Sequence, residues 1–296
     1  MISFRYHVVT VVAVFLALAA GVALGGGPLA ELGRAAEGTS AADAARLQQA
    51  RESAGYADQV LDRSSARLYA DRLAKDPVAV LVFPGVPEST QEAVRTQVAE
   101  AGGMVSAVWT VEPSLVSTGE KALVDTLGSQ LMTQLKRTGI EPTATTYDRM
   151  GQLLGLAMAT TKQGGAATSP MTDSVRQSLA GADLVSTEGT PASRADRVVV
   201  LLGDDTGAEE DPIYAGLLAG LSRQVGSLVV AADTADGASG RLARLREDPA
   251  TSSLTTVDGV DQLPGQVTTV LVLTEWPATR GHAYGASGAD GAVTLR

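Results

Sequence analysis

The run Val78–Phe83 (VAVLVF) decides the fold. It holds six consecutive apolar residues, which is the length of a strand. A strand without polar alternation is covered on both faces, as in a parallel sheet enclosed by helices. Asp76-Pro77 stands directly before it, and a proline disfavours helix at the residue that precedes it. The sequence therefore predicts an α/β fold with a mainly parallel sheet that starts at this run.

The same pattern returns later in the chain. Asp196–Leu202 (DRVVVLL) matches Asp76–Val82 (DPVAVLV) at an offset of 120 residues. Each run is followed by a helical pattern and a further apolar strand, Met104–Val111 in the first case and Ser227–Ala231 in the second. A strand–helix–strand unit with a crossover makes parallel strands. The repetition suggests an internal duplication, although convergence would give the same pattern.

These patterns predict one α/β domain over residues 77–296, with half-units at about 77–190 and 191–280. The segment Gln266–Leu273 suits a strand by its β-branched residues, and it suits equally a helix that starts near Asp261. The Gly- and Ala-rich tail over 281–296 is expected to be loose.

Residues 1–28 predict a transmembrane anchor or a signal sequence. Val8–Gly27 holds 20 consecutive residues without a charge, and a helix of that length spans about 30 Å, the thickness of a bilayer core. Arg5 on the N-terminal side favours a cytoplasmic N-terminus and an extracytoplasmic domain. A cleaved signal peptide with Ala17-Leu18-Ala19 as its cleavage site is the alternative, but the apolar run is longer than usual for one.

Residues 29–76 predict a helical stalk that self-associates. Small residues recur every four positions in the anchor, which lets two helices approach closely in lipid. Apolar positions recur every seven residues in the stalk, as in the seam of a coiled coil. The expected oligomer interface consists of Ala13, Ala17, Gly21, Gly25, Leu47, Ala54, Leu61 and Leu68. The alternative for the stalk is a single amphipathic helix that packs on its own domain.

Composition excludes several classes of function. The net charge of −10 argues against nucleic-acid binding, which needs clustered Lys and Arg. No cysteine is present, so disulfides and thiolate metal sites are excluded. Aromatic residues make up only 4% of the chain, which argues against stacking platforms for bases.

No catalytic motif is found, and we expect that the chain is not an enzyme. Neither apolar strand is followed by a Gly-rich phosphate loop, and no Gly-x-Ser-x-Gly elbow is present. The two histidines, His7 and His282, lie at opposite ends of the chain. A Ser-His-Asp triad would have to use His282 in the tail. We expect no bound cofactor.

The best candidate metal site is an acidic loop after the strand at Val198–Leu202. It consists of Asp204, Asp205, Glu209, Glu210 and Asp211. Open α/β sheets bind ligands at the carboxyl ends of their strands, and several carboxylates on one loop can hold a hard cation. The alternative is a solvated loop in which Asp211 caps the next helix and its acidic neighbours favour the helix N-terminus.

The opening MISFRYHVVTVVAVFLALAAGVALGGGPL resembles the start of the actinobacterial copper-transport outer membrane protein family, the MctB-like proteins. The likeness continues through the helical stalk, the strand that ends in Phe83-Pro84-Gly85, and the tail Gly281–Gly285, in which an alanine is interposed in a Gly-His-Tyr-Gly pattern. The resemblance covers essentially the whole chain, and the N-terminus is its most specific part.

The resemblance implies a role in copper transport or homeostasis at the cell envelope, by a channel or an efflux component. A non-catalytic, membrane-anchored envelope scaffold is the alternative function. The expected partners are the membrane, through the N-terminal helix, and further copies of the chain. Copper is expected as a transported ion without a tight site, because copper prefers thiolate, thioether or imidazole ligands. This chain has no cysteine, two histidines at opposite ends and no cluster among its six methionines.

Overall fold

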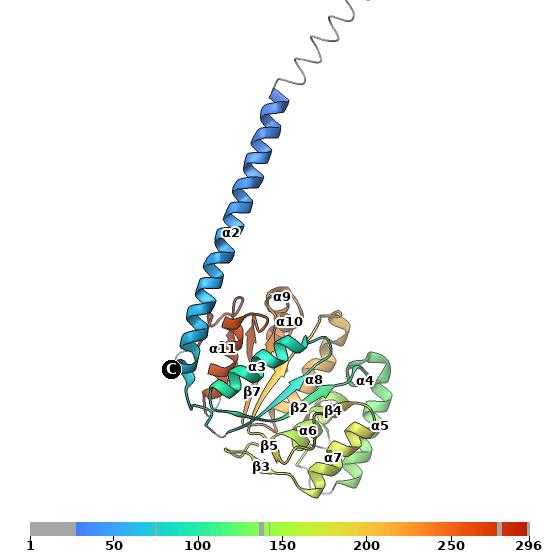
Figure 1. Ribbon diagram of the computed structural model, residues 1–296. Coiled ribbons are helices and arrows are strands. Elements are labelled where there is room, and N and C mark those ends of the chain that lie inside the picture. Colours follow the sequence, from blue (N-terminus) through green and yellow to red (C-terminus); the bar gives the residue numbers. More distant parts are fainter. Residues whose placement is uncertain (1–27, 75, 136–138, 142, 277–279, 295–296) are drawn as a thin grey trace, which may run out of the picture. The chain divides into compact units, whose positions relative to one another are not determined.

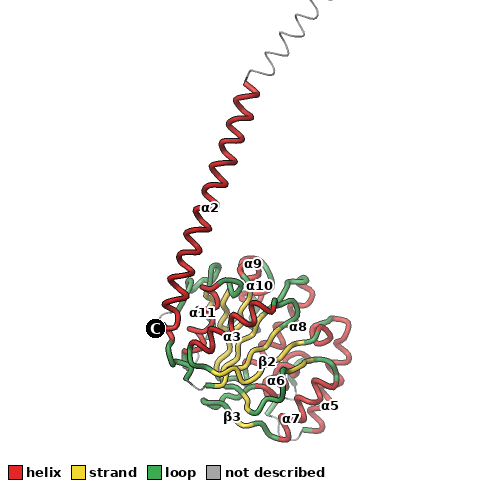
Figure 2. The backbone as a smooth tube through the Cα atoms, viewed as in Figure 1, coloured by secondary structure: helices red, strands yellow, loops and turns green. Residues whose placement is uncertain are grey.

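Seven strands form one sheet at the centre of the unit Leu61–Arg296 (Figures 1 and 2). Their order across the sheet is β4-β2-β1-β6-β7-β8-β9. The strands are β1 (Pro77–Val82), β2 (Met104–Val111), β4 (Val185–Thr187), β6 (Arg197–Leu201), β7 (Ser227–Ala232), β8 (Thr255–Asp258) and β9 (Ala283–Tyr284). All neighbours pair in parallel except β2 and β4. The predicted α/β fold with a mainly parallel sheet is confirmed.

The computed structural model describes residues 28–294 except 75, 136–138, 142 and 277–279, and it describes side chains from residue 43 onward. The chain divides into two units, Met1–Val60 and Leu61–Arg296. A separate two-stranded ribbon of β3 (Ala166–Ala167) and β5 (Ser193–Arg194) lies in the second unit.

The two predicted strand–helix–strand units run outward from the middle of the sheet in opposite directions. β1 pairs with β6, so the first strands of both units are neighbours. The chain then moves from β1 to β2 on one side and from β6 to β7, β8 and β9 on the other. The point between β1 and β6, where the winding reverses, is where doubly wound sheets normally bind ligands.

Helices cover both faces of the sheet, as the continuously apolar strands require. One face packs against α3 (Glu88–Glu100), α11 (Leu263–Thr274) and the last turn of α2 (Pro28–Tyr69). The other face packs against α4 (Pro113–Val116), α5 (Lys121–Gln134), α6 (Thr146–Met158), α7 (Pro170–Gly181), α8 (Asp211–Ser222) and α10 (Arg241–Glu247). Short helical turns η1 (Thr118–Glu120), η2 (Ala208–Glu210) and α9 (Thr234–Ser239) complete the described elements.

Helices α6 and α8 approach so closely that only glycine fits between them. A Cβ added to Gly151 would lie 2.1 Å from the carbonyl oxygen of Leu217, and one added to Gly220 would lie 2.1 Å from that of Asp148. The two backbones are therefore in van der Waals contact where these turns meet. This contact fixes α8, and with it the loop that precedes α8 at the carboxyl end of β6.

The ambiguous segment Gln266–Leu273 is helical and belongs to α11. Since β9 runs parallel to β8, the chain between them needs a crossover, and α11 supplies it. Seven consecutive residues of the helix, Val267–Leu273, are buried, so its apolar run reflects full enclosure rather than a strand.

The C-terminal tail is ordered against the sheet, in contrast to the loose tail expected from its composition. Tyr284 in β9 is buried, and its carbonyl oxygen accepts a hydrogen bond from Arg246 Nη2 at 3.0 Å. The backbone N–H of Ser287 donates to the buried carboxylate of Asp258 at 2.9 Å. Thr294 Oγ1 donates to Glu275 Oε1 at 2.5 Å. Polar contacts with distant residues, rather than apolar content, hold this Gly-rich segment.

Helix α2 spans 42 residues, which corresponds to about 63 Å. Its C-terminal part belongs to the second unit, where Ser65 and Tyr69 are buried. The Tyr69 hydroxyl donates to Gln97 of α3, and burial raises the pKa of this phenol. The predicted membrane segment Val8–Gly27 lies outside the described residues. Among the helices that the structure describes, none is long and apolar enough to cross a bilayer.

Asp196, directly before β6, generates a pH-dependent stability. Its carboxyl group is fully buried; Oδ2 accepts a hydrogen bond from Gly164 N at 3.0 Å, while Oδ1 has no partner among the described residues. Burial raises the pKa of Asp196, although the nearby Arg197 lowers it. The folded state therefore holds this proton more tightly than the unfolded state does.

We expect the wild type to lose stability relative to Asp196→Asn as the pH rises. Below the usual carboxyl pKa of about 3.9 both states are protonated, so the stability from this group is fully present, and it is lost as the pH passes the raised folded pKa. Urea denaturation followed by circular dichroism between acidic and neutral pH measures the difference. A difference between the two proteins that does not change with pH would contradict the assignment.

Candidate functional site

The switch point between β1 and β6 is filled by the chain itself. A Cβ added to Gly203 would lie 1.8 Å from the carbonyl oxygen of Pro84. Gly85 adopts φ +89°, and its added Cβ would lie 2.7 Å from Asp204 N. The loops after the two strands thus press backbone against backbone. The crevice in which doubly wound proteins hold a ligand is closed here, in agreement with the lack of a phosphate loop.

The structure brings three of the five predicted acidic residues together around two arginines of α10. Asp205, Glu210 and Asp211 each form ion pairs with Arg241 or Arg244. The side chains of Asp204 and Glu209 are exposed and take no part in these pairs. The loop is therefore organised mainly by guanidinium groups that arrive from a distant segment.

Arg241 is the centre of this cluster, and its side chain is 0% exposed. Its guanidinium donates to Asp211 Oδ1 at 3.3 Å and to Glu210 Oε2 at 3.0 Å. It also donates to the carbonyl oxygen of Asp204 at 3.3 Å and to Thr206 Oγ1 at 3.2 Å. A buried guanidinium is tolerated only when its donors and its charge are matched in this way.

An aromatic stack completes the environment of Arg241. The guanidinium carbon lies 3.8 Å from the ring centroid of Tyr214 in α8, within the range of a cation–π contact. Tyr214 in turn stacks on Phe83 at the end of β1, with ring centroids 4.8 Å apart. Burial raises the pKa of Tyr214 to about 12, against the opposing effect of Arg241, so the phenol stays neutral.

Arg244 holds the outer side of the loop. It binds both carboxylate oxygens of Asp205 at 2.9 Å, and it also donates to the carboxylate of Asp211. The hydrogen bond with Arg244 is the largest of the causes that lower the pKa of Asp205. The same carboxylates raise the pKa of Arg244. Both groups stay charged over the whole physiological range.

A shallow cavity of about 250 Å³ adjoins this cluster at the carboxyl ends of β6 and β7. Four of its lining residues are acidic: Asp204, Asp205, Asp233 and Asp236. Burial raises the pKa of Asp236, and its two oxygens accept hydrogen bonds from the backbone of Arg241 at 2.6 Å and Leu242 at 3.2 Å. Among the described residues, no three carboxylates or imidazoles are arranged to hold a metal ion. Metal binding at this loop stays a prediction.

Sequence reasoning missed Arg241 and Arg244. They lie 30 and 33 residues after Asp211, which they both bind. The available signal is the three-residue spacing of two arginines after Gly240, which places them on one face of a short helix. That pattern does not name the acids they reach, because the partners come from a different strand–helix unit.

The predicted oligomer interface is described only in part. Leu47 and Leu68 are 60% and 39% exposed, and Ala54 is exposed as well. Leu61 is partly buried and packs against the hydrophobic cluster of its own domain. The seam is therefore open at three of its four stalk positions. The other four predicted positions, Ala13, Ala17, Gly21 and Gly25, lie outside the described residues.

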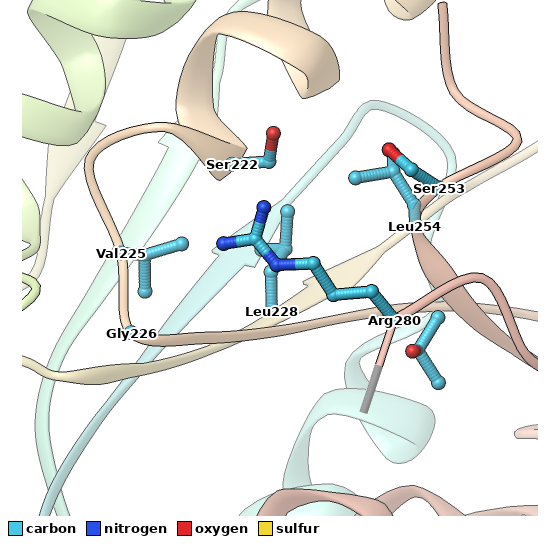
Figure 3. A pocket seen from close by; sticks show the side chains of 8 residues that line it. Ser222, Val225, Gly226, Leu228, Ser253, Leu254 and Arg280 are labelled. Carbon is cyan, nitrogen blue, oxygen red and sulfur yellow. The ribbon is translucent and has the colours of Figure 1, made fainter. Parts of the chain in front are cut away.

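A second cavity lies at the amino ends of the strands, between the end of α8 and the starts of β7 and β8 (Figure 3). It measures about 20 Å³, and with its open mouth it encloses about 290 Å³. Its lining residues are Ser222, Val225, Gly226, Leu228, Ser253, Leu254, Thr255 and Arg280. Figure 3 shows the Arg280 side chain extending across it, with the guanidinium on the side of Ser222 and Val225.

We expect Arg241→Met to destabilise the domain by about 1.5–3 kcal/mol, because Glu210 and Asp211 lose charge-assisted hydrogen bonds to a buried guanidinium, while Arg244 still pairs with Asp211. Arg46→Met removes the ion pair between Arg46 and Asp43. Because the Arg46 side chain is 81% exposed, this change should cost less than about 1 kcal/mol. Urea denaturation of both variants gives the two values. Similar values for the two would show that the Arg241 cluster is not a major source of stability.

The whole chain matches a known family. The family model described as "Copper transport outer membrane protein, MctB" matches residues 1–295. The copper transporter MctB of two strains of Mycobacterium tuberculosis and that of Mycobacterium bovis are each 27% identical to this chain over 299 residues, which cover 92% of both sequences. The resemblance stated from the sequence is thereby confirmed. The chain belongs to the MctB family of copper transport outer membrane proteins.

Proposed function

We propose that this copper transport protein acts as a membrane-anchored component whose α/β domain stands outside the cytoplasm. The match of the family over residues 1–295 carries the proposal, because it includes both the N-terminal segment and the domain. The uncharged run Val8–Gly27 supports a single-pass anchor, and Arg5 before it supports the orientation.

The chain takes part in copper transport without holding copper tightly itself. Copper(I) prefers thiolate and thioether ligands, and copper(II) prefers imidazole. The sequence has no cysteine and only two histidines, at positions 7 and 282. The acidic loop offers only weak oxygen ligands, and the carboxylates of Asp205, Glu210 and Asp211 already bind arginine. Any uptake of a divalent ion there involves the exposed Asp204 and Glu209.

The α/β domain serves as a non-catalytic interaction module in this process. The observation that favours this function is the closed switch point, where Gly85 and Gly203 bring two loops into backbone contact and occupy the usual ligand crevice. The nearest cavity is shallow and acidic, and its most buried acid, Asp236, is committed to capping the backbone of α10.

Helix α2 supports self-association as the means by which copies of the chain assemble. Its side chains at Leu47 and Ala54 are exposed and are spaced seven residues apart. A long helix with an exposed apolar seam gains stability from a second helix that covers it. Leu61 contributes less than the sequence suggests, because it already packs on its own domain.

We expect the full-length chain in detergent to bind neither copper(I) nor copper(II) stoichiometrically at sub-micromolar affinity. Titration in competition with a chelator measures this. The variant Asp204→Asn with Glu209→Gln removes the two exposed acids and keeps the arginine pairs, so it should abolish any weaker binding at the loop. A deletion strain should nevertheless have altered copper content and reduced copper tolerance.

Stoichiometric, tight binding would contradict the proposed absence of a tight site. Unaltered copper content and tolerance in the deletion strain would contradict a role in copper transport. The two measurements are independent, because the first concerns the purified chain and the second concerns the cell.

For the stalk, we expect Leu47→Lys with Ala54→Lys to shift the fragment 28–296 from oligomer to monomer in sedimentation experiments at tens of micromolar. Charges in a coiled-coil seam lose the apolar contact and repel each other. Tyr56→Lys is the matched control, because nine residues place it about 180° around the helix from Leu47, and its side chain is 71% exposed. A monomeric wild-type fragment, or equal effects of both changes, would contradict this seam.

A further inference from the structure

We propose that the cavity at the starts of β7 and β8 binds a small aliphatic carboxylate, with Arg280 as the residue that recognises its charge. This cavity lies at the amino ends of the strands, whereas the acidic loop lies at their carboxyl ends, and its chemistry is independent of copper. Three features point to this ligand: the pairing state of Arg280, the chemistry of the cavity wall and the size of the cavity.

Arg280 differs from the other described arginines that follow β1. Every described arginine that follows β1 makes a hydrogen bond or an ion pair with protein groups: Arg95, Arg149, Arg176, Arg194, Arg197, Arg223, Arg241, Arg244 and Arg246. Arg280 is the exception, and its guanidinium has no such contact with a described residue. The Arg280 side chain is also exposed, so its guanidinium is available to an external anion.

The guanidinium lies over a wall of mixed character (Figure 3). Val225, Leu228 and Leu254 are all buried and form the apolar part of the cavity. Ser222 and Ser253 bring hydroxyl groups to it. The Ser222 hydroxyl donates to the carbonyl oxygen of Ala219 at 2.8 Å, so it can only accept a further hydrogen bond. The Ser253 hydroxyl makes no hydrogen bond with another described residue. Ser253 can therefore donate to a bound anion.

This combination selects a carboxylate with a short apolar chain. A planar guanidinium matches a carboxylate in a two-pronged pair, which is stronger than a neutral hydrogen bond. The apolar wall accommodates an alkyl group and disfavours a multiply charged phosphate, which would have to give up water on that side. The cavity of about 20 Å³ has room for one small group, so only the tip of the ligand is enclosed and the rest occupies the mouth.

The test is a titration of the full-length chain in detergent with sodium propionate, followed by the NMR methyl signals of Val225, Leu228 and Leu254. We expect saturable shifts with a dissociation constant on the order of millimolar, as suits a ligand of so few atoms. Propionamide, which is isosteric and neutral, should give no saturable shift. Inorganic phosphate should bind more weakly than propionate.

Variants separate charge recognition from simple filling of the cavity. Arg280→Gln should weaken propionate binding about tenfold or more, and Arg280→Lys, which keeps the charge but loses the planar fork, should fall between. Arg223→Gln is the matched control, since it removes a half-exposed guanidinium next to Ser222 that pairs with Asp148 and does not line the cavity. It should bind propionate as the wild type does. Unchanged methyl spectra without ligand verify the fold of each variant.

Three results would overturn the proposal: no saturable shift with propionate, equal responses to propionate and propionamide, or equal loss in Arg280→Gln and Arg223→Gln. A blocked peptide with one central glutamate distinguishes the source of the carboxylate. Binding of propionate without binding of the peptide supports a small free acid. Binding of the peptide alone would assign the site to an acidic side chain of a protein and would overturn the small-acid proposal.

Discussion

The fully buried guanidinium of Arg241 is the constraint on which the arrangement of the loops at the carboxyl ends of the strands depends. Three groups of the loop between β6 and α8 meet it, the carbonyl oxygen of Asp204, the hydroxyl of Thr206 and the carboxylate of Glu210, together with the carboxylate of Asp211 at the start of α8. A charge without water is very costly unless its partners are in place, so the loop, α8 and α10 must adopt their positions together. The stack on Tyr214 and Phe83 extends the same constraint to the end of β1.

Glycines determine where two backbone segments of the fold can pack directly against each other. The chain contains 32 glycines and few aromatic residues, and several of the glycines stand where two backbones touch. Gly151 and Gly220 let α6 and α8 meet, and Gly203 lets the loops after β1 and β6 meet. The core is therefore built from close backbone approach and aliphatic side chains, and a methyl group added at these points would force the elements apart.

Membership in a copper transport family and the chemistry of this chain agree with the proposed role of the domain as an interaction module. The described residues place carboxylates where arginines neutralise them, and the crevice at the switch point is closed. Both features hold the fold in one arrangement, and neither offers a soft ligand to copper. The cavity at the starts of β7 and β8 is different, because there the guanidinium of Arg280, which has no partner among the described residues, lies over an apolar wall.

The sequence by itself determined the elements that have a local signature. The runs at Val78–Phe83 and Val198–Leu202 predict buried parallel strands. At the start of α7, Ser169 forms a capping box with Thr172, which stands only three residues later in the chain. The N-terminal pattern identified the family. These signals survive because strand length, capping and apolar runs depend on residues that are neighbours in the chain.

Only the tertiary structure decided the pairing of β1 with β6, the helical state of α11, the docking of the tail and the partners of the acidic loop. Each depends on residues far apart in the chain: Asp211 with Arg241 and Arg244, and Asp258 with Ser287. A charge in a sequence shows that a partner is needed when it is buried, but it does not show which one. The fold makes that choice, because it sets which distant groups are brought within hydrogen-bonding distance.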